Sequence, residues 1–147
     1  MTSRYFVDTN VWVYAVDDSE PDKQARARTV VAPSPDKDIV VSAQVLGEFY
    51  VTVRRKLAET VPEPDATALV ERMRRLAVVP IDGDLVSSAI ANATAWQVSY
   101  WDALIIAAAE ASGCDVVLSE DLGHGRTYGA VRAENPFIAA QEPASSD

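Results

Sequence analysis

Apolar runs of two lengths alternate along the chain. Four short runs predict buried strands, at residues 4–7, 39–41, 78–81 and 116–118. Longer stretches between and around them predict helices, which span residues 10–16, 21–31, 43–59, 65–76, 83–97 and 100–113. Because a parallel strand covered on both faces is apolar throughout, this alternation predicts a mostly parallel sheet with helices on both sides.

Polar residues mark where several predicted helices begin. Ser42, Asp82 and Ser99 each directly precede a helical stretch. Their side chains can accept a hydrogen bond from the first turn of the helix. Pro21 suits the first position of another helix, where its missing N–H is not needed. These boundaries support the predicted order of elements.

The C-terminal part of the chain is less regular. Residues 120–132 contain several glycines and predict a loop, while residues 135–137 predict a short edge strand. No repeat and no linker interrupts the sequence. We therefore predict one α/β domain over residues 1–139, a three-layer α/β/α sandwich with a sheet of four to five strands. A short polar tail follows at residues 140–147.

The composition narrows the possible chemistry. The 147 residues include one histidine and one cysteine, Cys114. This excludes an internal disulfide, a cysteine-rich zinc or iron–sulfur site and a two-histidine acid–base pair. The sequence has no glycine-rich phosphate-binding motif. It also has no run of 18 apolar residues and no secretory leader, so we expect a soluble cytoplasmic protein without a membrane partner.

The net charge of −9 is unevenly distributed, since residues 80–147 carry 10 of the 22 acidic side chains and 2 of the 13 basic ones. An acidic protein is a poor non-specific binder of nucleic acid, but it suits a protein that gathers carboxylates around a cation. The basic runs at 54–56 and 72–75 are either solvated helix faces or surfaces that follow a phosphate backbone. Arg126, in the loop after Asp121, is better placed for a contact with a phosphate group.

Four acidic residues fall at the carboxyl ends of predicted strands or in the helices beside them. Asp8 ends the first strand, and Asp121 follows the fourth strand by three residues. Glu48 lies in the helix after the second strand, and Asp102 lies in the first turn of the last helix. In open α/β sheets, functional sites form outside the carboxyl ends of the strands. We therefore expect these acids to assemble into one site.

Each acid also has a purely local interpretation. Asp8 can cap the helix that follows it, and Asp102 can form a capping box with Ser99. Glu48 belongs to a polar helical stripe that can face solvent. Asp121 lies in a turn-forming sequence. Spacing alone leaves both interpretations open.

Taken together, the motifs around these acids resemble those of the PIN-domain nucleases, most closely the VapC-type toxins of type II toxin–antitoxin pairs. The resemblance covers about residues 5–138. The matching stretches are Asp8-Thr-Asn10, Gly47-Glu48, Tyr100-Trp-Asp102-Ala-Leu-Ile and Leu118-Ser-Glu-Asp121.

This resemblance implies an Mg²⁺-dependent endoribonuclease, with Mn²⁺ as a substitute, that a VapB-like antitoxin inhibits and that forms a homodimer. The metal ligands would be Asp8, Asp102 and Asp121. The catalytic cluster that it implies has four members: Asp8, Glu48, Asp102 and Asp121.

Three further residues are candidates for a supporting role. Thr9 matches the hydroxyl that accompanies the first aspartate in the family, and Asn10 belongs to the same motif. Glu120 directly precedes Asp121 and can compete with it. Whether Glu120 joins the acidic cluster is left open by the sequence.

The residue types suit this chemistry. Mg²⁺ and Mn²⁺ prefer carboxylate oxygens, and a metal ion activates water toward a phosphodiester. Hydrolysis by water leaves a 5′-phosphate and a 3′-hydroxyl, whereas attack by a 2′-hydroxyl calls for an acid–base pair that one histidine does not supply. Without metal, clustered carboxylates repel one another, which raises their pKa values.

Two other functions compete with the nuclease. A receiver-like metal-binding regulatory module has parallel strands with acids at their ends. Its pattern has paired acids after the first strand and a late lysine, whereas here Asp8 stands alone and no lysine follows Lys56. An inactive PIN-like scaffold is the second alternative, and the presence of all four acids disfavours it.

The helix after the second strand carries an unusual amount of apolar surface. Its apolar residues are either core or part of a groove for an amphipathic antitoxin segment. The residues concerned are Val45, Phe49, Tyr50 and Val53.

Overall fold

Six strands form one sheet in the order β3-β2-β1-β4-β6-β5 in the computed structural model, which describes residues 2–139. All strand pairs are parallel except the β5–β6 pair. The tail predicted for 140–147 lies outside the described residues. The strands are β1 (Ser3–Val7), β2 (Lys37–Ser42), β3 (Ala77–Val79), β4 (Val116–Leu118), β5 (Thr127–Tyr128) and β6 (Val131–Glu134).

Helices join β1 to β2, β2 to β3 and β3 to β4, as the hydrophobic pattern predicts. The side chains of Ser42, Asp82 and Ser99 accept hydrogen bonds from the first turns of the helices that follow them, which confirms all three predicted caps. The helices are α1 (Thr9–Tyr14), α2 (Pro21–Val31), α3 (Ala43–Lys56), α4 (Glu63–Met73), α5 (Gly83–Trp96), α6 (Tyr100–Ala111) and α7 (Pro136–Ala139).

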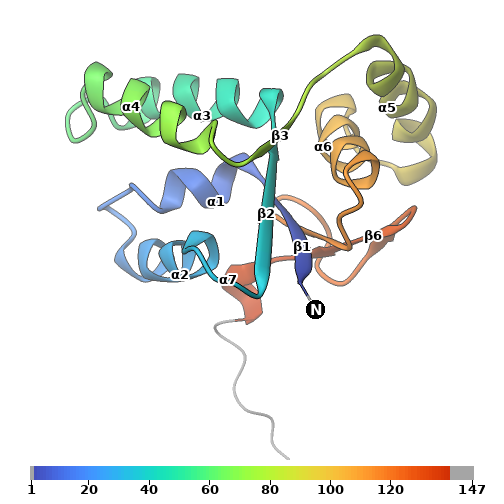
Figure 1. Ribbon diagram of the computed structural model, residues 1–147, viewed down its shortest axis with the longest axis horizontal. Helices are drawn as coiled ribbons and strands as arrows, with labels where there is room; N and C mark the ends of the chain where they lie inside the picture. The colour runs from blue at the N-terminus through green and yellow to red at the C-terminus, as the bar shows by residue number, and fades with distance from the viewer. Residues whose placement is uncertain (1, 140–147) are drawn as a thin grey trace, which may run out of the picture.

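The two faces of the sheet bury separate sets of side chains. Phe6 and Val117 belong to the larger core, which includes α3, α4, α5 and α6. Val7 and Leu118, their neighbours in sequence, point to the opposite face and pack with α1, α2 and α7. Figure 1 shows α1 and α2 on one side of the sheet and α5 and α6 on the other. The predicted three-layer α/β/α architecture is therefore confirmed.

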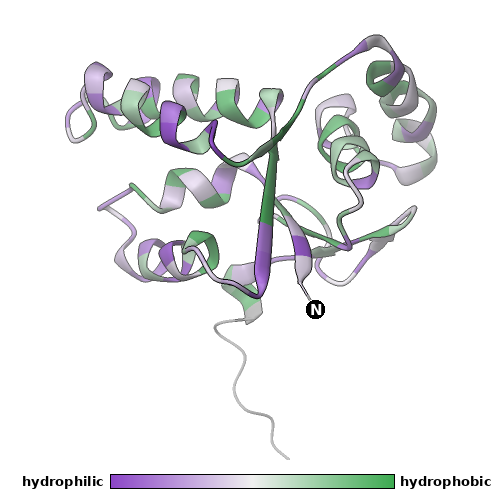
Figure 2. Cartoon of the chain, viewed as in Figure 1, coloured by the Kyte–Doolittle hydropathy of each residue, from purple (hydrophilic) through white to green (hydrophobic). Residues whose placement is uncertain are grey.

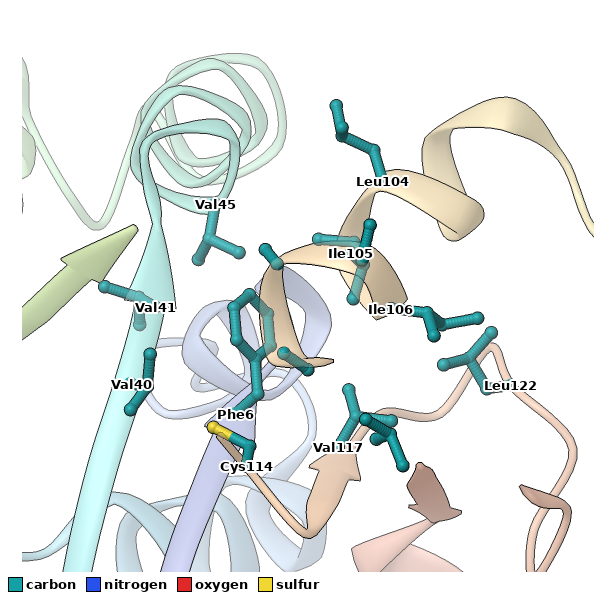
Figure 3. Packing of buried hydrophobic residues seen from close by; sticks show 14 of the residues in the cluster. Phe6, Val40, Val41, Val45, Leu104, Ile105, Ile106, Cys114, Val117 and Leu122 are labelled. Atoms are coloured by element: carbon teal, nitrogen blue, oxygen red, sulfur yellow. The ribbon is translucent and has the colours of Figure 1, made fainter. Parts of the chain in front are cut away.

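Helix α6 is the most deeply buried helix of the fold. Every residue from 103 to 109 is buried, and the helix shows little hydrophilic colour along this stretch in Figure 2. Figure 3 shows Ile105 of α6 near Phe6 and Val45, and Ile106 near Leu122. This burial fixes the first turn of α6 against the sheet. No helix within residues 2–139 is long and apolar enough to cross a membrane.

The C-terminal segment differs from the prediction. Residues 135–137 do not form an edge strand, because Asn135 caps α7 by accepting a hydrogen bond from the Phe137 N–H at 2.9 Å. The strand lies earlier, at β6, which begins within the predicted loop, and Gly129, with φ +59°, turns the chain between β5 and β6. The sheet therefore has six strands rather than four to five.

The apolar surface of α3 is core and not a groove. Val45, Phe49 and Val53 are 0 to 1% exposed. Tyr50 is half-buried and packs against the same core. The prediction of an antitoxin groove at these residues is therefore wrong, and the alternative interpretation, that they are core, is correct.

Candidate active site

The four candidate acids lie around the carboxyl ends of the two central strands. Asp8 directly follows β1, and Asp121 follows the neighbouring strand β4 by three residues. Asp102 lies in the first turn of α6 and Glu48 lies in α3. Two central parallel strands and two helices thus bring together residues that are far apart in sequence.

Asp8 is the most buried of the four acids, with 5% of its surface exposed. Burial raises the pKa of its carboxyl to about 6. Hydrogen bonds from the Ser119 hydroxyl at 2.8 Å and from the Thr9 N–H at 2.7 Å lower that pKa, while the nearby charges of Asp121 and Glu48 raise it. Asp8 also caps α1, so its predicted local role is confirmed, and this role is compatible with a place in the site.

Asp102 responds to the same group of charges. Burial raises the pKa of its carboxyl, the charges of Asp121 and Glu48 raise it further, and a hydrogen bond with Ser99 lowers it. The Ser99 hydroxyl accepts the Asp102 N–H at 3.1 Å, which is one half of a capping box. The acids are close enough to oppose one another's ionisation.

Glu48 is held in place by two donors from different elements. The Thr9 hydroxyl donates to Oε1 at 2.9 Å, and Gln44 Nε2 donates to Oε2 at 3.1 Å. Gln44 Nε2 also contacts the backbone oxygen of Trp101 at 3.3 Å, which links α3 to α6. Glu48 therefore faces the other acids, and the solvent-facing interpretation of its stripe is wrong.

The segment that carries Asp121 is fixed by Ser119 and Asn10. Ser119 is fully buried, and its hydroxyl accepts the Asp121 N–H at 3.0 Å while donating to Asp8. Asn10 Nδ2 donates to Asp121 Oδ2 at 3.1 Å, and Asn10 Oδ1 accepts the Glu120 N–H at 3.1 Å. Asn10 thus holds the backbone and the side chain of this segment together.

Glu120 has partners of its own on the helices α1 and α2. The Tyr14 hydroxyl donates to its Oε1 at 2.8 Å, and Lys23 Nζ lies 2.5 Å from its Oε2. The hydrogen bond to Glu120 raises the pKa of Lys23, so the Lys23 ammonium group keeps its proton at neutral pH. Glu120 is thus paired with Lys23, whereas the hydrogen bonds of Asp121 come from Asn10 and Ser119.

Arg126 makes contacts within the fold. Its guanidinium donates to the backbone oxygen of Trp96 at the end of α5 and lies over the Tyr128 ring, 4.5 Å from the ring centre. It does not border the cleft beside the acids, whereas Arg55 and Lys56 do. Two residues of the basic run at 54–56 therefore border the cleft beside the acids, whereas Arg126 does not.

A cleft of about 820 Å³ lies between α1 and α3, next to the acids. Val51, 60% exposed, and Val13 give it apolar walls. Gly47 also borders it, and a Cβ atom placed there would meet no atom within 4 Å. Intramolecular packing therefore does not require glycine at this mid-helix position. The acids along the cleft are Asp17, Glu20, Glu48, Glu120 and Asp121.

Ser119, Gln44 and Lys23 were not predicted as part of the site. Ser119 lies directly after a buried strand, and a hydroxyl at such a position is a usable signal for the sheet edge. Gln44 stands four residues before Glu48, the spacing of neighbours on one helix face. Lys23 gives no signal, because its partner is 97 residues away in sequence.

The donor set fits a hard divalent cation. The facing groups are carboxylate oxygens, with hydroxyl and amide groups behind them, which is the chemistry that Mg²⁺ and Mn²⁺ select. Within residues 2–139, however, no three acidic, histidine or cysteine side chains are arranged to hold a metal ion. The carboxylates of Asp8, Glu48 and Asp121 instead each accept hydrogen bonds from donors of their own.

Comparisons with known proteins agree with this geometry. The model of the PIN domain family matches residues 5–130. VapC20 of Mycobacterium tuberculosis, described as a sarcin–ricin loop cleaving toxin, has 19% identity and a TM-score of 0.61, over 93% of this chain and 95% of its own.

Two solved complexes share the fold as well. VapBC2 of Rickettsia felis, bound to promoter DNA, has 17% identity and a TM-score of 0.63, over 90% of this chain and 98% of that chain. A toxin–antitoxin complex from Klebsiella pneumoniae has 14% identity and a TM-score of 0.64, over 90% and 97%. No curated protein sequence matches this chain. Since the family model matches residues 5–130, which is most of the chain, this protein belongs to the PIN domain family.

Proposed function

We propose that this protein is an endoribonuclease toxin of the VapC type that depends on Mg²⁺, or on Mn²⁺ in its place. One observation carries the proposal: the buried carboxyl of Asp8 lies within the electrostatic reach of Asp121 and Glu48, and both of these acids border an open cleft. Such a group of carboxylates opposes its own ionisation and gains from a cation. The receiver-like alternative is not supported by the family assignment.

In this proposal Asp8, Asp102 and Asp121 hold the divalent cation through carboxylate oxygens. When bound, the cation supplies positive charge to the phosphodiester and lowers the pKa of water. Glu48, held by Thr9, accepts the proton that the attacking water loses. Water attacks phosphorus, the bond from phosphorus to the 3′ oxygen breaks, and that oxygen takes up a proton from solvent, so that the products carry a 5′-phosphate and a 3′-hydroxyl.

The proposed partners are RNA, a cognate VapB-like antitoxin and a second copy of the chain, and we place the reaction in the cytoplasm. Two of the related structures are toxin–antitoxin complexes, which supports the antitoxin. The cleft beside the acids, with Val51 exposed on its wall, offers a surface that a segment of the antitoxin can cover.

The test is cleavage of defined single-stranded and structured RNAs by the purified protein, with Mg²⁺ or Mn²⁺ and with a chelator. Asp102→Asn is expected to lower the rate more than about 100-fold while circular dichroism stays unchanged, because it removes a metal ligand rather than an outer partner. Analysis of the new RNA ends checks the bond that breaks.

Asp38→Asn is the matched control, since Asp38 is an acid at the opposite end of the same sheet. It is expected to cleave as the unchanged protein does. Full activity of Asp102→Asn, or cleavage that persists in the chelator, contradicts the proposal.

A further inference from the structure

The three residues after β4 are each held by a different part of the fold. Ser119 is bonded to Asp8, at the end of β1. Asp121 is bonded to Asn10, in the first turn of α1. Glu120, between them, is bonded to residues further along α1 and in α2. The position of Asp121 therefore depends on its own contacts and on those of the two residues that precede it.

Glu120, Lys23 and Tyr14 are each hydrogen-bonded to the other two. Lys23 Nζ reaches Glu120 Oε2 and also the Tyr14 hydroxyl at 3.2 Å, and that hydroxyl donates to Glu120 Oε1. The side chains of Lys23 and Glu120 are 31% and 27% exposed. This pair is more enclosed than the other cation–carboxylate pairs of residues 2–139.

Two aromatic rings fix the ammonium group of Lys23. It lies 4.7 Å from the centre of the Tyr14 ring and 5.6 Å from that of the Phe137 ring. The two rings meet edge to face at 5.0 Å. A cation held over aromatic faces keeps its position better than one on a free side chain. The C-terminal helix α7 thereby contributes to the placement of Lys23.

The charge of Glu120 matters because of where this residue lies. Glu120 borders the same cleft as Glu48 and Asp121. Without a cationic partner it would be a fifth carboxylate beside four that already oppose one another. An unpaired carboxylate next to that group either competes for the cation or displaces its neighbour Asp121.

We propose that Lys23 is a positioning residue, which holds Glu120 toward α2 and thereby fixes the segment of residues 119–121 that presents Asp121 to the cation. This inference rests on the proposed function. It accounts for an acid beside Asp121 that takes no part in the acidic cluster.

The first test needs neither metal nor RNA. Amide hydrogen exchange is measured at Glu120 and Asp121 in the metal-free protein. The N–H of Glu120 donates to Asn10, and the N–H of Asp121 donates to Ser119. Lys23→Met keeps the length of the side chain and removes its charge. It is expected to speed exchange at both amides about tenfold or more, because the segment opens locally more often. Exchange equal to that of the unchanged protein overturns the proposal.

The second test uses RNA cleavage. Lys23→Met is expected to lower kcat about tenfold, as for loss of an outer-shell partner, with KM changed less than about twofold. The double variant Lys23→Met/Glu120→Gln is expected to recover kcat to within about threefold and to slow amide exchange again, because no unpaired carboxylate remains. A double variant as impaired as Lys23→Met overturns the proposal.

Two controls separate this role from a general loss of stability. Arg74→Met removes another paired cation, 3.0 Å from Glu71 at the end of α4, and is expected to change neither readout. Lys23→Arg keeps the charge and is expected to restore slow exchange; if it exchanges as fast as Lys23→Met, the proposal is wrong. Should the unchanged protein cleave no RNA, the proposed function fails, whereas the exchange result still stands or falls by itself.

Discussion

The two ends of the parallel strands differ in how their charged side chains are partnered. At the amino end, Arg4 pairs with Asp38 at 3.2 Å, and Lys37 Nζ donates to the backbone oxygen of Val30 at 2.7 Å. At the carboxyl end, Asp8 and Asp102 have pKa values that burial and neighbouring acids raise. In Figure 2, β2 is hydrophilic at its amino end and hydrophobic further along.

The two ends therefore differ in how their charges affect the stability of the fold. Opposite charges near the surface are close to neutral for stability. A buried carboxyl among like charges opposes folding whenever it is ionised. Strongly shifted carboxyl groups of this kind cluster at functional sites, which makes this end of the sheet the candidate site.

The largest expected effect on stability is a pH dependence that comes from Asp8. Its pKa is about 6 in the folded protein and 3.8 in an unfolded chain, so the folded state holds the proton more tightly. The stability from this group is present below about pH 4 and is lost as the pH rises through 6. Asp8→Asn should therefore gain stability relative to the unchanged protein between pH 4 and 8, by up to about 3 kcal/mol.

Urea unfolding of the metal-free proteins at several pH values measures this change. Asp8→Ala serves as a second variant, because it lowers the free energy of unfolding at every pH but removes the same titrating group. For both variants, the difference in the free energy of unfolding from the unchanged protein should change with pH by the same amount. A difference that is independent of pH contradicts the raised pKa of Asp8.

A smaller effect is expected from divalent cations. Mg²⁺ or Mn²⁺ at ten times its dissociation constant should raise the free energy of unfolding by about 1.4 kcal/mol, because it binds the folded acids and not the unfolded chain. Thermal melting measures the shift. Glu48→Gln combined with Asp121→Asn should remove most of it, whereas Asp38→Asn should retain it. An unchanged shift in the double variant would place the cation elsewhere.

The smallest effect is expected at the amino end. Asp38→Asn removes the partner of Arg4, and both side chains are largely exposed, 40% for Arg4 and 58% for Asp38. Unfolding in urea should show a loss of no more than about 1 kcal/mol, which added salt reduces further. A larger loss would mean that the two ends of the sheet differ less than their charges indicate.

Much of the fold could be predicted because its signals are local. Apolar runs give β1, β2, β3 and β4, and the capping side chains that start three of the helices stand directly before them. The order of elements then places Asp8 and Asp121 on neighbouring strands. The convergence of the acids at one sheet edge follows from this topology.

The remaining features depend on partners that are distant in sequence. Strand β6 alternates buried Val131 and Ala133 with outward-facing residues in a segment of glycines and charges, so its pattern is short and easily taken for a loop. The direction of Glu120 is decided by Lys23, and that of Arg126 by the end of α5. No spacing rule within one segment predicts such contacts.

The sheet ends on both sides in very short strands, and this limits how the protein can associate. Its outer strands are β3, with three residues, and β5, with two. A long open edge invites another chain to continue the sheet, through backbone pairing that reads little sequence. Within the described residues the outer strands offer little backbone for such pairing, so helix faces and side chains are the larger surface for contacts with another molecule. Contacts of this kind depend on side-chain identity, and they therefore discriminate among partners more than backbone pairing does.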